Sequence, residues 1–115
     1  MTCRASQVIM RMNFAICATT FTLLCAAAVG VSAADASALA AQYNCQACHA
    51  LDQKVVGPSY KEVAAKYAGD SGALVRLEKK VKSGGSGVWG AIPMPPNNLP
   101  DADLEALVEW ILAAK

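Results

Sequence analysis

The segment Cys45-Gln46-Ala47-Cys48-His49 constrains the fold of this chain more than any other feature. Two residues separate its cysteines, and the only histidine of the 115 residues follows them directly. Thiol and imidazole groups bind metals, and thiols also form disulfides and other covalent bonds. The group that this cluster binds therefore decides what the surrounding chain packs around.

The N-terminal part of the chain has the composition of an export leader. Arg4 and Arg11 precede an uncharged, mostly apolar run over residues 13–34, in which the segment VSA ends at Ala33. A positive start, an apolar centre and a small-residue cleavage site are typical of a secretory signal peptide. We expect residues 1–33 to be a cleaved signal peptide and residues 34–115 to form one exported domain.

Other interpretations of the leader stay open. An apolar run of about 20 residues is long enough to span a bilayer, so an uncleaved leader would anchor the domain to the membrane. Cys25 would be the lipidated residue of a lipoprotein, although Leu24 before it is larger than such a site prefers. Met10 or Met12 would serve equally well as the start, because the leader from Met12 is still adequate.

Processing changes both the charge and the cysteine count. The leader holds two of the ten basic residues and none of the nine acidic ones, so the exported domain has a formal charge of −1. Its lysines are scattered, which gives no indication of nucleic-acid binding. Three of the five cysteines also lie in the leader, and the remaining pair could form only a tight local disulfide. A domain of roughly 80 residues buries so little surface that its core needs another supplement.

Apolar spacing predicts an all-helical domain. A first helix is expected over residues 37–50, and the repeat from Tyr60 to Tyr67 predicts a second that a glycine stops. A third is expected over residues 73–82, before a glycine-rich break. Prolines then exclude helix from the segment VWGAIPMPPNN, and Pro100 opens the last helix. The expected buried stripe of that helix is Leu104, Leu107, Val108, Ile111 and Leu112.

Zinc and dithiol chemistry fit the cysteine cluster poorly. A structural zinc site needs four ligands, but no cysteine or histidine follows His49. A thioredoxin-like dithiol lies near a βαβ pattern, and no strand pattern precedes Cys45. Covalent haem attachment fits better, because C-x-x-C-H is the signature of c-type cytochromes. In a helical segment the two sulfurs would lie about one turn apart, facing the porphyrin edge, with the histidine aimed at its centre.

Met94 is the candidate for the second axial ligand of the iron. It is the only methionine of the exported domain, and it lies between prolines in the segment IPMPP. A methionine that only fills a core sits on an apolar helix face, not in a proline-rich loop. A thioether ligand would favour reduced iron, and it would fill the last coordination position, which argues against small-molecule chemistry there.

Several segments together resemble a known family. CQACHALDQKVVGPSYKEVAAKYAG, GVWGAIPMPPNN and LVEWILAAK occur in the order and spacing of the short bacterial class I cytochromes c of the c-551 type. The resemblance covers nearly all of residues 36–115. It implies a small monohaem cytochrome c fold, all-α, with about four helices around one covalently bound haem c.

The resemblance also implies roles for individual residues. Cys45 and Cys48 would carry the thioether bonds to the haem, and His49 and Met94 would be the axial ligands of its iron. The carbonyl of Pro58 would accept a hydrogen bond from the second ring nitrogen of His49 and so fix its tautomer.

Further residues would surround the haem. The resemblance implies that Trp89 hydrogen-bonds a haem propionate and that Asn97 hydrogen-bonds near the methionine sulfur. Lys80 stands where the family often has an arginine near a propionate, and a lysine offers a point charge in place of a bidentate fork. The family also tends to place an aromatic residue before the motif, where Ala40 and Ala41 stand here.

Tyr43 is the one aromatic residue near that position, and whether it replaces the missing contact between the terminal helices stays open. Trp110 lies on the last helix, where the family packs an aromatic residue, and core packing is its simplest interpretation.

The function implied by the resemblance is that of a one-electron carrier of the periplasm, not an enzyme. The expected partners are redox proteins: a membrane cytochrome complex as donor, and a periplasmic reductase or terminal oxidase as acceptor. We expect a monomer. At the exposed haem edge, a weak docking patch is expected from Ala47, Val55, Val56, Ala91 and Ile92. The alternative is that these residues are ordinary core.

Two rival functions remain. In the first, Met94 is displaced and the chain is an enzyme or a ligand sensor with an open iron position. In the second, the chain is a membrane-anchored carrier or a haem subunit of a larger oxidoreductase.

Overall fold

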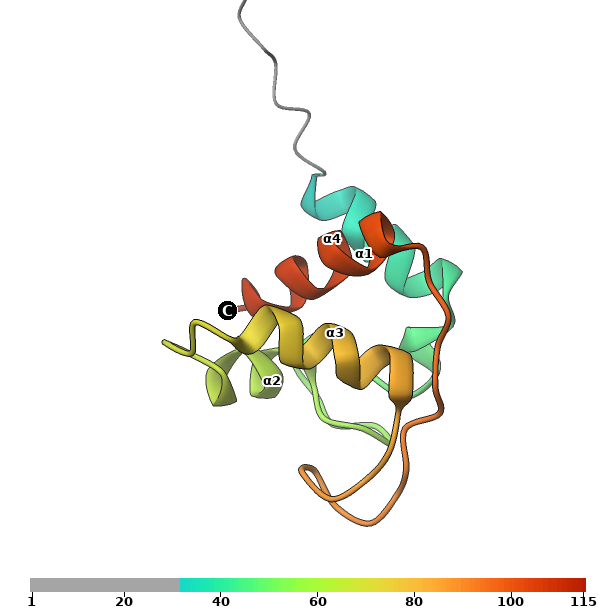
Figure 1. Ribbon diagram of the computed structural model, residues 1–115, viewed down its shortest axis with the longest axis vertical. Coiled ribbons are helices and arrows are strands. Elements are labelled where there is room, and N and C mark those ends of the chain that lie inside the picture. The colour runs from blue at the N-terminus through green and yellow to red at the C-terminus, as the bar shows by residue number, and fades with distance from the viewer. Residues whose placement is uncertain (1–31) are drawn as a thin grey trace, which may run out of the picture.

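The computed structural model describes residues 32–115, which form four α-helices and one 3-10 turn (Figure 1). In chain order these are α1 (Ala33–Gln42), η1 (Cys45–Ala47), α2 (Tyr60–Lys66), α3 (Ala73–Ser83) and α4 (Asp101–Leu112). Within the described part there are only two isolated β-bridges and no strand. The expected all-helical fold is therefore confirmed. Most of the predicted leader lies outside the described residues.

The first helix differs from its predicted bounds. α1 begins earlier than expected, because Ser32 caps it and forms a reciprocal capping box with Asp35. It ends at Gln42 instead of continuing through the cysteine motif. Asn44 adopts a left-handed backbone with φ 62°, which breaks the helix, and the cysteines then lie on the short turn η1. The prediction that the motif continues the first α-helix was wrong.

The other helices agree with the apolar spacing. α2 starts at a second capping box, in which Ser59 and Glu62 satisfy each other's backbone N–H groups. α3 ends at Ser83, and the capping residue Gly84 has a φ of 62°, in the left-handed region that favours glycine. α4 follows Pro100, with Asp101 and Asp103 in its first turn.

α4 is the centre of the core. It packs against α1, α2 and α3, and its residues Leu104, Leu107 and Val108 are buried as predicted, whereas Ile111 and Leu112 are only partly buried. None of the helices among residues 32–115 has the length and the apolar character that crossing a bilayer requires.

Contact between the terminal helices is made by a small residue and a tyrosine. Ala40 is completely buried in the core, while Ala41 is exposed. Tyr43 packs partly on the same cluster, and its hydroxyl donates a 2.6 Å hydrogen bond to Asp103 of α4. This bond raises the pKa of Tyr43 above its ordinary value, because the phenol is held as a donor. Tyr43 therefore does join the terminal helices.

The long segment between α3 and α4 is ordered by backbone hydrogen bonds. Gly85 and Met94 form a two-bond bridge, in which the Gly85 N–H donates to the Met94 carbonyl at 2.9 Å and the Met94 N–H donates back at 3.1 Å. The N–H of Asn97 donates to the carbonyl of Val81 at 2.9 Å. These bonds fix the position of the proline-rich part of the segment against the end of α3.

Candidate functional site

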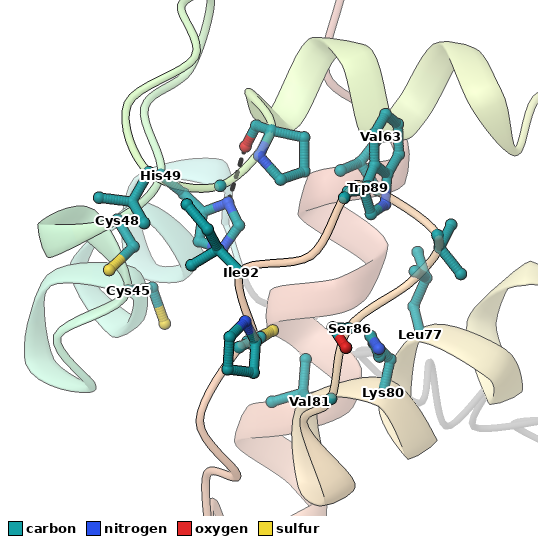
Figure 2. Close-up of a pocket in the computed structure, with 18 of the residues that line it drawn as sticks. Cys45, Cys48, His49, Val63, Leu77, Lys80, Val81, Ser86, Trp89 and Ile92 are labelled. Atoms are coloured by element: carbon teal, nitrogen blue, oxygen red, sulfur yellow. Dashed lines mark hydrogen bonds between the residues drawn. The ribbon is translucent and has the colours of Figure 1, made fainter.

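A cavity of about 500 Å³ opens between the cysteine motif, α3, α4 and the segment after α3 (Figure 2). Its volume lies within the range of small-molecule and cofactor pockets. Apolar side chains from three helices form much of its wall, namely Val63, Leu77, Val81, Leu107, Val108 and Ile111. An apolar, roomy cavity of this kind suits a large flat ligand with few polar groups.

The motif residues meet at one side of the cavity. Figure 2 shows Cys45, Cys48 and His49 close together, opposite Trp89 and Lys80. The backbone N–H groups of Cys48 and His49 both donate to the carbonyl of Cys45, at 3.1 and 3.0 Å, which winds the motif into a tight turn. Both thiols are free and partly buried, and burial raises the pKa of Cys45.

The imidazole of His49 is held through one nitrogen. Nδ1 lies 2.7 Å from the carbonyl oxygen of Pro58, and because a carbonyl can only accept, Nδ1 carries the proton. Nε2 is then the nitrogen with a free lone pair. Gly57 lies directly against this ring, since a Cβ there would stand 2.9 Å from Nδ1 and from Nε2. The histidine is thus oriented by a hydrogen bond and by the close approach of a glycine.

Met94 lines the same cavity from the segment after α3. Its backbone is fixed by the bridge to Gly85, and Gly84 lies so close that an added Cβ would stand 2.8 Å from the carbonyl carbon of Pro95. Such a clash would be with backbone, which cannot rotate away. The structure therefore brings together the histidine and the methionine that the sequence singled out.

The far side of the cavity carries positive charge beside an indole. Trp89 and Lys80 both line it. The ammonium group of Lys66 on α2 lies 5.2 Å from the centre of the Trp89 ring, a distance typical of a cation–π contact. Asn97 is not among the lining residues, and its side-chain amide donates to the carbonyl of Pro95 at 3.0 Å.

Sequence reasoning missed the contribution of Tyr60, which it had assigned only to an apolar helix face. The Tyr60 ring is stacked on His49, with ring centres 5.8 Å apart and planes 18° apart, and it meets Trp110 edge-on at 5.0 Å. Burial, and secondarily the charge of Cys45, raise the pKa of Tyr60 to about 12. The role of Lys66 was missed as well, because only the folded chain brings it to Trp89.

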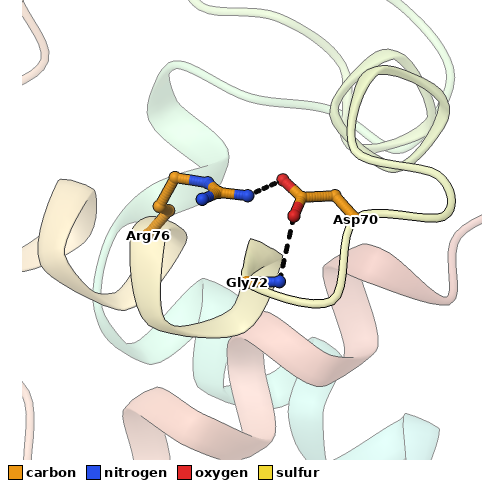
Figure 3. Close-up of polar contacts among 3 residues, drawn as sticks. All are labelled: Asp70, Gly72 and Arg76. Carbon is orange, nitrogen blue, oxygen red and sulfur yellow. Dashed lines mark hydrogen bonds and ion pairs between the residues drawn. The ribbon is translucent and has the colours of Figure 1, made fainter.

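A polar cluster at the start of α3 lies apart from this cavity (Figure 3). Asp70 pairs with the guanidinium of Arg76 and accepts a 2.9 Å hydrogen bond from the N–H of Gly72. None of the three lines the cavity. Across residues 32–115, no three histidine, cysteine, aspartate or glutamate side chains gather as a metal site.

The residues present fit a haem. Two thiols lie on one side of an apolar cavity, a histidine offers Nε2, a methionine lines the same space, and cationic side chains stand on the far side. Fold and site together define a small all-helical protein that surrounds a covalently attached haem.

Comparisons with known proteins agree with this class of protein. The family model for cytochrome c matches residues 33–115. Cytochrome c-551 of Pseudomonas aeruginosa is 49% identical over 76% of this chain and 85% of the relative. Cytochrome c-552 of Nitrosomonas europaea is 55% identical over 75% of this chain and 84% of the relative. The crystal structure of wild-type Nitrosomonas europaea cytochrome c552 is 55% identical, with a TM-score of 0.66 over 69% of this chain and 99% of that chain.

The chain belongs to the cytochrome c family, and it is a class I cytochrome c of the c-551 type. The family resemblance and the fold class predicted from the sequence are confirmed. Membership of the family also establishes the cofactor, a covalently bound c-type haem, and supports a general role as an electron carrier.

Proposed function

We propose that this chain is an exported one-electron carrier in which His49 and Met94 would bind the haem iron. The observation that carries the proposal is that both side chains line one cavity. The His49 ring is held by the carbonyl of Pro58, and the backbone of Met94 is held by its bridge to Gly85. When bound, the haem supplies an iron that changes its oxidation state by one electron. The chain supplies the ligands, the burial and the rigidity that make this change easy.

Cys45 and Cys48 would attach the haem. Each of the two thiols would hold the haem through one carbon–sulfur bond. The bonds supply the core supplement that a domain this small needs, and they prevent its loss. The free lone pair of His49 Nε2 is available to the iron, because Nδ1 keeps its proton on the carbonyl of Pro58.

Met94 would close the site. A thioether ligand favours reduced iron, and the proline-rich segment around Met94 limits how far the ligand moves when the charge of the iron changes. A site with little movement and no open position passes electrons and excludes substrates. Asn97 holds the same segment through Pro95, and we propose that it tunes the methionine through this segment.

Trp89 and Lys80 would bind the polar edge of the haem. Both lie opposite the cysteines. The indole N–H would donate to a propionate, and the ammonium of Lys80 would balance its charge as a point charge. The cation–π contact with Lys66 adds a second positive group beside Trp89.

Electrons would enter and leave near the motif. The proposed docking patch comprises Ala47, Val55, Val56, Ala91 and Ile92, of which all but Ala47 also line the haem cavity. A membrane cytochrome complex as donor, and a reductase or terminal oxidase as acceptor, would bind there weakly and briefly.

Export would place the carrier in the periplasm as a monomer. We propose that residues 1–33 are removed and that residues 34–115 remain. Cleavage after Ala33 removes the cap Ser32 but leaves Asp35 in the first turn of α1, where a carboxylate still favours the helix.

Mass spectrometry of the isolated protein tests processing and attachment together. A mass equal to residues 34–115 plus one haem is expected. The ligand assignment is tested by absorption spectroscopy: Met94→Ala should abolish the ferric thioether charge-transfer band of the wild type. A band that persists unchanged in the variant would show that Met94 is not the ligand.

A further inference from the structure

The Tyr60 hydroxyl is a buried polar group with no hydrogen-bond partner in the proposed electron-transfer site. The side chain of Tyr60 is only 4% exposed, and its hydroxyl is the one buried side-chain oxygen or nitrogen in the described part of the chain that has no hydrogen-bond partner. The residue itself is firmly placed, because its N–H donates to the carbonyl of Ala50 at 2.9 Å and its ring is enclosed by His49 and Trp110.

An unpaired buried hydroxyl destabilises a fold, and native proteins rarely keep one. A phenylalanine would fill the same space without this penalty. Tyr60 lines the haem cavity, so the missing partner can be supplied by the contents of that cavity. On this side of the cavity the polar side chains are those of the motif, Cys45, Cys48 and His49, and His49 Nε2 is the nitrogen proposed to bind the iron.

The sulfur of Cys45 is a candidate acceptor, because Cys45 lines the same cavity and packs against the core cluster that contains Tyr60. As a free thiol its hydrogen points to the carbonyl of Tyr43, with a sulfur–oxygen distance of 3.8 Å. Once the thiol has added to a vinyl group, the sulfur has no hydrogen and can only accept.

We infer that Tyr60 is a further positioning residue of the electron-transfer site, whose hydroxyl donates a hydrogen bond to the Cys45 sulfur after haem attachment. This rests on the proposed attachment through Cys45 and the proposed ligation by His49. The positive end of the hydroxyl then lies next to the haem edge, beside the axial histidine. A positive dipole there disfavours the more positive ferric state, so Tyr60 raises the reduction potential.

Tyr60→Phe tests the inference in the haem-loaded protein, because it removes one oxygen and keeps the stacked ring. Tyr67→Phe is the matched control, since Tyr67 also packs on the core from the end of α2 but does not line the cavity. Reduced wild type is mixed with an equal amount of oxidised variant, and the share of electrons on each is measured. We expect Tyr60→Phe to lose electrons to the wild type by about twofold to tenfold in the exchange constant, as one hydrogen bond allows. For Tyr67→Phe the exchange constant with the wild type should stay near one.

Proton NMR of the reduced protein identifies the acceptor. The wild type should show a slowly exchanging hydroxyl proton with cross-relaxation to the β-protons of Cys45, and Tyr60→Phe should lack it. The inference is overturned if the hydroxyl proton exchanges freely with solvent, or if the two phenylalanine variants share electrons equally with the wild type. A failure of the proposed function is distinguishable, because a wild type without the ferric thioether band has lost its ligand assignment whatever Tyr60 does.

Discussion

Gly57 is a position where a single added carbon should disturb His49 directly. The glycine lies against the ring of His49, and a Cβ there would stand 2.9 Å from both ring nitrogens. Carbon and nitrogen atoms in contact normally keep about 3.5 Å or more. Since the ring carbon Cε1 would lie closer still than the two nitrogens, the ring in Gly57→Ala must retreat by roughly 1 Å.

That retreat acts on a ring with little freedom. His49 is held on one side by the 2.7 Å hydrogen bond to Pro58 and on the other by the stacked ring of Tyr60. Overpacking of this kind costs about 1–3 kcal/mol, and the weakened hydrogen bond adds about 0.5–1.5 kcal/mol. We expect Gly57→Ala to lower the free energy of unfolding by about 2–4 kcal/mol.

Guanidinium unfolding of the haem-loaded protein measures this loss. With a slope near 3 kcal/mol per molar, a loss of 3 kcal/mol lowers the midpoint by about 1 M. Gly72→Ala is the matched control, because the nearest atoms to its new Cβ belong to the guanidinium of Arg76, an exposed and movable group. That control should lose less than about 1 kcal/mol, through the poorer capping by alanine. Equal losses in the two variants would refute the reasoning.

Three further perturbations test other contacts by the same unfolding measurement. Gly84→Ala and Gly87→Ala both place alanine at a position with positive φ, but only at Gly84 would the new carbon meet backbone. Gly84→Ala should therefore lower the free energy of unfolding by about 1 kcal/mol or more beyond the loss in Gly87→Ala. Similar losses in the two variants would contradict the predicted clash. Lys66→Met should remove the cation–π contact with Trp89 and lower stability by about 0.5–1 kcal/mol, while Lys66→Arg retains it; a loss in both variants would count against the contact. Hydrogen bonds from the capping box lower the pKa of Glu62 below its ordinary 4.5, so its carboxylate stabilises the fold above that pH and less as the pH falls. Glu62→Gln should therefore lose less stability than the wild type on acidification, and parallel pH profiles would contradict this.

The helices that the sequence predicted correctly are those whose signals are local. α2 has a serine and a glutamate at capping-box spacing, and α4 has a proline and acidic residues at its start. The end of α1 was not predictable in the same way. Asparagine at position 44 tolerates both helical and left-handed backbone, and only the packed structure selects the second.

The residues of the site also fall into those with a local sequence signal and those without one. Its motif residues could be proposed from the sequence because thioether attachment demands a fixed spacing. Met94 could be proposed as a ligand because no other methionine remains in the expected exported domain. The stacking of Tyr60 on His49 and the placement of Lys66 over Trp89 join residues from different elements. Such contacts depend on how the elements pack, and no local pattern in the chain encodes them.

Carbon monoxide binding tests the central claim most directly, because the account depends on an iron closed by His49 and Met94. The reduced protein is titrated with carbon monoxide at neutral pH, and the Soret spectrum is recorded. A closed site predicts an unchanged spectrum for the wild type and ready binding for Met94→Ala, in which a coordination position is open. Stoichiometric binding by the wild type would contradict the carrier assignment and would favour an enzyme or a ligand sensor.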